Sequence, residues 1–256
     1  MLIAIDVGNT QTVMGLFEGE ELVDSWRLST VRDRTADEYR LLLAGLLRQD
    51  GYRLEDVDGV ALSSVVPTAK QAMIEVAHDL VEGLVVVVGP GVRTGLPINI
   101  DNPREVGADR VVNSVAAAKK YGTPVVVVDF GTATNMDVVD GSGAYVGGAI
   151  APGLEISQTA LIDATAALRR VDLDPPRAPI GKNTVEAIQS GLLYGHAGLV
   201  DGIVGRIVDE MDGNPAVVAT GGLASTIVPH CRTVDRVDET LTLDGLRMVY
   251  EMNLEE

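Results

Sequence analysis

One local pattern occurs twice in this sequence and restricts the folds available to the chain. Each copy is a short apolar run followed by aspartate, one further residue and glycine. Residues 2–5 precede Asp6-Val7-Gly8-Asn9-Thr10, and residues 125–128 precede Asp129-Phe130-Gly131-Thr132. Short apolar runs bounded by a glycine turn are typical of buried strands, and apolar residues after each turn predict a returning strand. The pattern therefore predicts two β-hairpins and, because it is repeated, a duplicated fold.

The turn of the first hairpin is suited to a phosphate group. Gly8 has no side chain and can adopt a positive φ, so a phosphate could approach the backbone N–H groups of residues 8–11. The hydroxyls of Thr10 and Thr12 would be further donors. Asp6 would hold a hydrated Mg²⁺, because this ion keeps several waters and needs only one or two carboxylates. The alternative is an ordinary hairpin in which Asp and Asn only favour the turn.

A third element belongs to the same series. Residues 216–220 predict an apolar strand that ends in Gly221-Gly222, where an adenine or ribose could lie against bare backbone. Two phosphate elements followed by an adenosine element resemble the superfamily of acetate and sugar kinases, heat-shock ATPases and actin.

This resemblance implies a duplicated, actin-like (ribonuclease H-like) α/β fold of two domains, each with a mixed central sheet flanked by helices. Elsewhere the predicted strands alternate with helices, which also indicates an α/β sheet. We expect an N-terminal domain of residues 1–115 with the first hairpin. Residues 116–256 would form the second domain, with the second hairpin, the adenosine element and a long helix.

A polar motif stands at the start of a helix that the apolar spacing predicts to end near Tyr121. Its residues are Gly107-Ala108-Asp109-Arg110. In one interpretation Asp109 faces a cleft and orients or deprotonates an alcohol, while Arg110 holds an anionic acceptor. In the other, the two residues form an exposed ion pair that contributes little.

Four motifs together narrow the resemblance to one family. They are Asp6-Val7-Gly8-Asn9-Thr10, Gly107-Ala108-Asp109-Arg110, Asp129-Phe130-Gly131-Thr132-Ala133-Thr134 and Gly181-Lys182-Asn183-Thr184. In this order they resemble the type III pantothenate kinases over nearly the full chain. The resemblance implies ATP-dependent phosphorylation of pantothenate to 4′-phosphopantothenate, the first step of coenzyme A biosynthesis. It also implies a homodimer that requires K⁺ or NH4⁺ in addition to Mg²⁺.

The same resemblance assigns expected roles. Asp109 would be the catalytic base, and Asp129 would bind the monovalent cation. Gly107, Ala108, Asp109, Arg110 and Thr184 would bind pantothenate. The residues expected to contact ATP lie in the two hairpins and the paired glycines: Asp6, Val7, Gly8, Asn9, Thr10, Gln11, Thr12, Val13, Thr132, Gly221 and Gly222.

One stretch departs from the family. Many relatives carry an aromatic residue shortly before the Gly-Ala-Asp-Arg motif, where this chain has Ile98-Asn99-Ile100-Asp101. This departure bears on substrate affinity more than on reaction type. Two other functions also remain open. One is a kinase of another small hydroxy acid or sugar, and the other is a nucleotide-binding regulator without turnover.

A long predicted helix, residues 183–211, carries glycine on one face. Asn183 and Glu186 resemble a capping box at its start. The glycines are spaced four and three apart, which puts them on one side of a helix: Gly191, Gly195, Gly198, Gly202 and Gly205. Because glycine destabilises helices, this face predicts close packing either against the sheet or against a second subunit. In the second case Thr184 of one subunit would reach pantothenate near Asp109 of the other.

Composition limits the partners. The formal net charge of −17 and scattered basic residues disfavour nucleic acid and anionic membranes. The single cysteine, Cys231, rules out an intrachain disulfide, and the dispersed His78, His196 and His230 disfavour zinc. The chain begins without a signal core and has no run of about 20 apolar residues. We therefore expect a cytoplasmic protein.

Overall fold

The computed structural model describes residues 1–254, and tertiary contacts divide them into two compact units. The first unit holds Met1–Leu96, Asp101–Ala116 and residues 240–254, and the second holds Pro97–Ile100 and Ala117–Glu239. The predicted domain boundary lies between residues 115 and 116. In the structure the chain crosses from the first unit to the second between Ala116 and Ala117, one residue later. The last helix, α7 (Leu241–Leu254), was expected in the second domain but packs in the first unit.

The first unit is built on a five-stranded mixed sheet with the order β3-β2-β1-β4-β5. Strands β1, β2 and β3 form an antiparallel meander, and β4 and β5 extend the sheet in parallel with β1. Their bounds are Leu2–Val7, Gln11–Glu18, Glu21–Ser29, Gly59–Ser64 and Val85–Val87.

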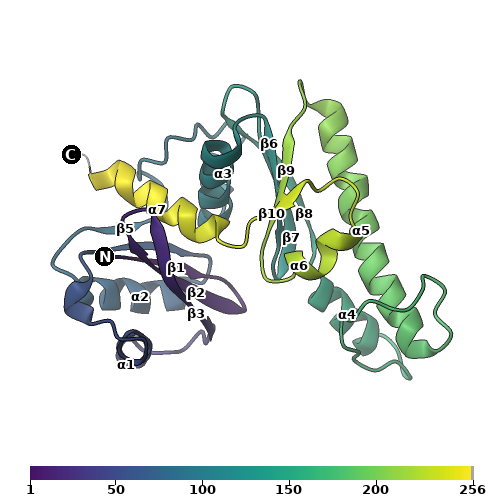
Figure 1. The fold of residues 1–256 in the computed structure, drawn as a ribbon, viewed down its shortest axis with the longest axis horizontal. Coiled ribbons are helices and arrows are strands. Elements are labelled where there is room, and N and C mark those ends of the chain that lie inside the picture. Colours follow the sequence, from purple (N-terminus) through teal and green to yellow (C-terminus); the bar gives the residue numbers. More distant parts are fainter. Residues whose placement is uncertain (255–256) are drawn as a thin grey trace. The chain divides into compact units, whose positions relative to one another are not determined.

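The second unit repeats this topology in a sheet with the order β10-β9-β6-β7-β8. Here β6, β7 and β8 form the antiparallel meander, and β9 and β10 are parallel to β6. The bounds are Val125–Phe130, Ala133–Val139, Tyr145–Pro152, Ala216–Thr220 and Arg236–Val237. The duplicated α/β fold with mixed sheets is therefore confirmed (Figure 1).

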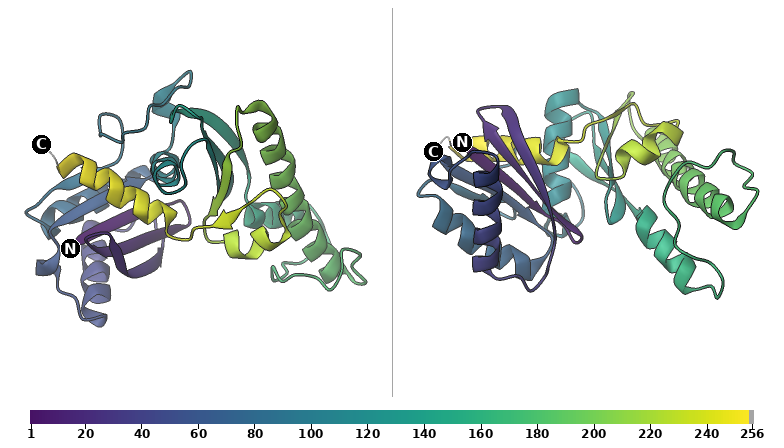
Figure 2. Two further views of the ribbon diagram at one scale, coloured as in Figure 1. Left: turned by 45° about the horizontal axis from the view of Figure 1, so that its top comes forward. Right: turned by 60° about the horizontal axis from the view of Figure 1, so that its bottom comes forward.

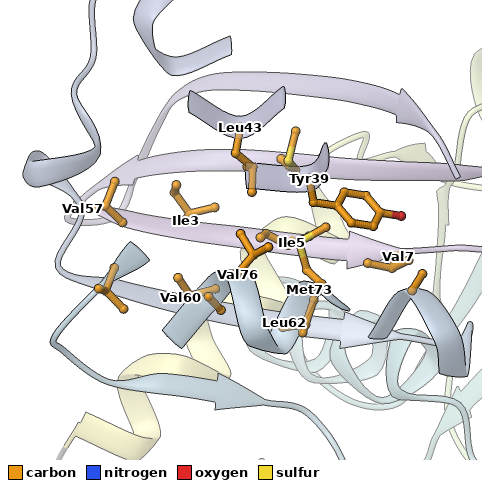
Figure 3. Close-up of a cluster of buried hydrophobic side chains, with 14 of the residues drawn as sticks. Ile3, Ile5, Val7, Tyr39, Leu43, Val57, Val60, Leu62, Met73 and Val76 are labelled. Carbon is orange, nitrogen blue, oxygen red and sulfur yellow. The ribbon is translucent and has the colours of Figure 1, made fainter. Parts of the chain in front are cut away.

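The core of the first unit fills one face of its sheet (Figure 3). Alternate residues of β1, namely Ile3, Ile5 and Val7, point to this face, as the two-residue period of a strand requires. Helices α1 (Ala36–Gln49) and α2 (Pro67–Leu80) cover it. Strands β1, β2, β4 and β5 also contact α7, which buries most of its apolar residues. A β-sheet with apolar residues on both faces must be covered by helices on both sides. Because α1 and α2 cover only one face, the C-terminal helix α7 packs in the first unit.

The core of the second unit lies between its sheet and the long helix α5 (Thr184–Glu210). Apolar side chains of β6, β7 and β9 meet those of α5, and α4 (Leu154–Asp163) adds Leu154. All views show α5 running beside this sheet (Figure 2). Helix α3 (Ala108–Tyr121) begins in the first unit and ends in the second. The short helix α6 (Ala224–Ile227) follows β9.

The caps of two helices differ from expectation. At α5, Asn183 Oδ1 accepts from the Glu186 N–H at 2.9 Å as predicted, but the Glu186 carboxylate accepts from the Lys182 N–H and from Arg177. Half of the capping box is thus present. A complete box, which we did not predict, starts α1 at Thr35 and Glu38. No helix among residues 1–254 is long and apolar enough to span a membrane.

Candidate active site

The first hairpin ends in a tight turn. The last paired residues are Val7 and Thr12, and the Gly8 N–H donates to the Gln11 carbonyl at 3.0 Å. Gly8 does not adopt the positive φ that we had allowed for. Glycine suits this position for another reason, since a Cβ here would lie 3.0 Å from the Gln11 carbonyl oxygen. The turn itself, Asn9, Thr10 and Gln11, is exposed to solvent.

The two threonines expected in the phosphate site differ in their surroundings. Thr10 is exposed in the turn, whereas Thr12 is fully buried and its Oγ1 lies 2.9 Å from Oγ1 of Thr30. Val13 is partly buried on the strand that follows. The polar groups that the hairpin presents to solvent therefore come from Asn9, Thr10 and Gln11.

Asp6 lies on β1 in register with Ser63 of β4, and Ser63 Oγ donates a hydrogen bond to Asp6 Oδ1. Burial raises the pKa of Asp6 to about 7, the Ser63 hydrogen bond opposes this rise, and the charge of Asp109 adds to it. Asp6 and Asp109 thus lie near enough in the first unit for the charges of their carboxylates to interact. Sequence reasoning gave Ser63 no role, because only the strand register reveals its partner.

Asp109 occupies the first turn of α3, where its Oδ1 accepts from the backbone N–H of Arg110 at 2.9 Å. A Cβ at Gly107 would lie 2.4 Å from this oxygen, so glycine there gives the carboxylate room. Burial raises the pKa of Asp109, against the lowering effect of the hydrogen bonds and of Arg110. Asp109 and Arg110 are both partly buried, unlike the exposed ion pair of the alternative interpretation. The first turn of α3 thus holds the Asp109 carboxylate in place, and burial there raises its pKa.

In the second unit, the second hairpin and the paired glycines meet. Asp129 is in register with Thr220 of β9, as Asp6 is with Ser63, and the strand leads directly into Gly221. Gly221 has a φ of 92°, and a Cβ there would lie 2.5 Å from Asp129 Oδ1 and 2.7 Å from the backbone of Phe130. Only glycine can adopt this conformation at such close approach. Gly222 is exposed and has open space around it.

The tip of the second hairpin rests on the start of α4. The Gly131 N–H donates to the Ala133 carbonyl at 3.0 Å, and Thr132 is exposed. A Cβ at Gly153, the residue before α4, would lie 2.3 Å from the Thr132 carbonyl oxygen. Gly153 therefore lies against this tip, and the sequence analysis assigned it no role there.

Thr184 does not join the second hairpin. It is exposed at the first position of α5, twelve residues before His196, which contacts the hairpin. Twelve residues of helix span about 18 Å. Thr184 thus lies about 18 Å along the helix from the residue that contacts the hairpin.

The glycine face of α5 is open in this chain. Gly191, Gly195 and Gly198 are exposed, and a Cβ added to any of these three, or to Gly205, would meet no atom within 4 Å. At Gly202 it would meet only the side chain of Arg206. Close packing of the glycines against the sheet, the first of our two alternatives, is therefore wrong. The opposite face of the helix packs on the sheet.

The segment that lacks the aromatic residue pairs with the second sheet. The Asn99 N–H donates to the Tyr145 carbonyl, and the Tyr145 N–H donates to the Pro97 carbonyl, both at 2.8 Å. Ile98 and Ile100 are partly buried. The backbone of this stretch is thus fixed without an aromatic side chain.

Solved structures with the same fold include several sugar kinases. The ROK hexokinase of Thermus thermophilus superposes with a TM-score of 0.53 over 99% of both chains, at 14% identity. A polyphosphate/ATP-glucomannokinase of Arthrobacter sp. strain KM gives 0.52 over 100% of this chain and 99% of that one, at 15% identity. A conserved putative Baf family transcriptional activator of Campylobacter jejuni gives 0.61 over 99% and 100%, at 16% identity. At these identities the similarity establishes the actin-like fold alone.

Sequence relatives are much closer. The type III pantothenate kinase of Moorella thermoacetica is 52% identical over 253 residues, which are 99% of this chain and 100% of that protein. The type III pantothenate kinase of Geobacter sulfurreducens is 51% identical over 255 residues, with 100% of both chains covered. The family description of type III pantothenate kinases matches residues 2–206. On this evidence the chain belongs to the type III pantothenate kinase family.

Proposed function

We propose that this protein transfers the γ-phosphoryl group of ATP to pantothenate, forming 4′-phosphopantothenate in the first step of coenzyme A biosynthesis. The observation that carries the proposal is identity of about half the residues with type III pantothenate kinases over the whole chain. The geometry agrees, because each unit presents a hairpin with a strand-end aspartate and an exposed turn. A cytoplasmic location stays a prediction.

Asp109 is the proposed general base. Burial raises its pKa, which strengthens a carboxylate as a base, and the first turn of α3 holds it in place. It would accept the proton of the acceptor hydroxyl as that oxygen attacks the γ-phosphorus. Arg110 and the backbone of Gly107 and Ala108 would bind the acceptor beside it. Phosphoryl transfer requires mainly such positioning and charge stabilisation.

Asp6 is the proposed magnesium residue. Its carboxylate stands at the phosphate turn and interacts unfavourably with the charge of Asp109, so a cation beside it would relieve the repulsion. Ser63 fixes one carboxylate oxygen. Mg²⁺, when bound through water, would neutralise charge on the phosphates. Residues 8–11 would donate backbone N–H groups to the same phosphates.

Asp129 is the proposed residue for K⁺ or NH4⁺. Its carboxylate lies close to Gly221 at the base of the second hairpin, since a Cβ at Gly221 would lie 2.5 Å from its Oδ1. Carboxylate and backbone carbonyl oxygens together are suitable ligands for a monovalent cation. Thr132 at the tip and the open backbone of Gly222 would contact the nucleotide.

The proposed working unit is a homodimer with a shared acceptor site. Five glycines leave one face of α5 open to close approach by another helix. Exposed apolar side chains also occur in the same unit, and such surfaces commonly mark interfaces. They include Val146, Ile150, Ile156, Leu161, Ile180 and Val185. Thr184, exposed at the first position of α5, would complete the site of the partner.

Release of ADP tests the reaction. With Mg²⁺ and K⁺ present, we expect ADP release from ATP to require pantothenate. A panel of other hydroxy acids and sugars tests the rival kinase. A preference for one of them would replace pantothenate as the acceptor, and ATP binding without turnover on any acceptor would favour the regulator.

Mixing two inactive variants tests the shared site. Asp109→Asn and Thr184→Ala subunits, allowed to exchange, form heterodimers in which one site keeps both residues and the other has lost both. We expect activity to return in the mixture. If both variants are inactive alone and exchange is verified, an inactive mixture contradicts the shared site. A monomer in solution contradicts the dimer.

A further inference from the structure

A buried histidine joins the long helix of the second unit to the second hairpin. His196 of α5 is 5% exposed, and its Nε2 lies 2.9 Å from Oγ1 of Thr134 on β7, which is 1% exposed. Its ring also contacts Phe130 of β6, with 6.1 Å between ring centroids. One side chain of α5 therefore contacts both strands of the hairpin.

The two contacted residues have a particular place in the hairpin. Phe130 and Thr134 face each other as the last pair of the β6–β7 ladder before the turn. Beyond them lie only Gly131, Thr132 and Ala133, the tip that is proposed to contact the nucleotide. The distance and orientation of this last pair set the conformation of the tip, because three residues must close the chain between them.

The sequence of α5 gives the contact further meaning. Seven of its residues are buried, and the other six are apolar: Ile188, Leu192, Leu193, Ala197, Val200 and Val204. A polar side chain in such a core costs stability unless it is hydrogen-bonded, and a hydrophobic residue would fill the space without that requirement. Among these seven buried residues, His196 is the one polar side chain, and it lies at the helical turn that contacts the last residue pair of the hairpin. Burial lowers the pKa of His196, which keeps the imidazole neutral and able to exchange a hydrogen bond with a hydroxyl.

We propose that His196 is a positioning residue for the nucleotide site, which holds the closing pair of the second hairpin through its contacts with Thr134 and Phe130 and so sets the tip for the phosphates of ATP. It does not touch the nucleotide itself. The inference rests on the proposed function only in that the second hairpin binds nucleotide phosphates.

Four substitutions separate the hydrogen bond from the ring contact. Thr134→Val keeps the shape of the side chain and removes the hydroxyl, and Thr134→Ser restores the hydroxyl. His196→Phe keeps a ring beside Phe130 and removes the hydrogen bond, and His196→Gln offers a polar group in place of Nε2. Thr233→Val is the matched control, because Thr233 Oγ1 donates a hydrogen bond at 2.9 Å to Oδ1 of Asp201, which lies on α5 and is not a residue of the hairpin.

The measurements are the dissociation constant of a non-hydrolysable ATP analogue, by calorimetry, and the KM for each substrate. We expect Thr134→Val and His196→Phe to weaken analogue binding and raise the KM for ATP by roughly five- to tenfold, the size of one lost hydrogen bond. The KM for pantothenate should stay near that of the unaltered protein. Thr134→Ser and His196→Gln should recover most of the affinity. Thr233→Val should lower the melting temperature without changing nucleotide affinity.

Three results have distinct meanings. If the unaltered protein fails to bind the analogue, the proposed function itself is wrong. If it binds, and folded Thr134→Val binds equally well, His196 is only a core residue and the inference is overturned. An equal loss of affinity in Thr233→Val would also overturn it, because the effect would then follow stability alone. Should His196→Phe fail to fold, the two Thr134 variants decide.

Discussion

Replacing Asp6 with asparagine should stabilise the ligand-free protein while abolishing its activity. The pKa of Asp6 is raised from 3.8 to about 7, chiefly by burial. The folded state therefore holds the proton more tightly than the unfolded chain, and stability is lost as pH rises from about 4 to about 7. Above pH 7 the folded protein carries an ionised carboxylate in an unfavourable place. Asparagine has the same shape, remains neutral and can still accept the hydrogen bond of Ser63.

The magnitude follows from the pKa. The pKa of Asp6 is about 3 higher in the folded protein than in the unfolded chain, and each pKa unit is worth 1.36 kcal/mol. The free energy of unfolding is therefore lowered by about 4 kcal/mol at pH 8.5 and by roughly half of that at pH 5.5. Part of Asp6 remains accessible to solvent, so these values are upper bounds. For a chain of this size, about 4 kcal/mol corresponds to a rise in melting temperature of roughly 10 °C.

Thermal unfolding of the ligand-free protein at pH 5.5 and 8.5 measures this effect, in buffers without Mg²⁺ or nucleotide. Asp33→Asn, at an exposed position, is the control for the change in net charge. We expect Asp6→Asn to gain stability beyond this control, and to gain more at pH 8.5 than at pH 5.5. Added Mg·ATP should stabilise the unaltered protein and not the variant. A gain no larger than that of Asp33→Asn, or equal at both pH values, would refute the reasoning.

Three further predictions concern the proposed catalytic residues. Asp109→Asn should lower turnover by roughly 10²-fold or more while leaving circular dichroism unchanged, because the amide keeps the shape but cannot accept the proton; near-normal turnover in the folded variant would limit Asp109 to positioning. Activity at constant Mg²⁺ and ionic strength should require K⁺ or NH4⁺ and fail in Na⁺, and equal rates in the three salts would exclude the proposed role of Asp129. Gly107→Ala should lower turnover strongly, because the new Cβ would lie 2.4 Å from Asp109 Oδ1 in the present conformation; Gly141→Ala, where a Cβ meets open space, should not, and equal rates for both would show that Asp109 does not need this room.

Much of the fold could be predicted from local patterns. The repeated strand, aspartate and glycine identified both hairpins, because strand period and turn chemistry act over a few residues. The helix start at Asn183 was equally readable, since a cap involves residues three apart. The site motifs were found in the same way, as short runs in which neighbours in sequence act together.

Contacts between distant residues were decided only by the tertiary structure. The pairing of Asp6 with Ser63, and of His196 with Thr134, depends on strand register and helix packing, which no short run of sequence contains. The glycines of α5 could have faced the sheet or a second subunit, because a helical period puts them on a common face without fixing the direction of that face. The last helix was assigned to the wrong unit for the same reason: burial of apolar area favours any uncovered sheet face, and only the assembled chain shows which face that is.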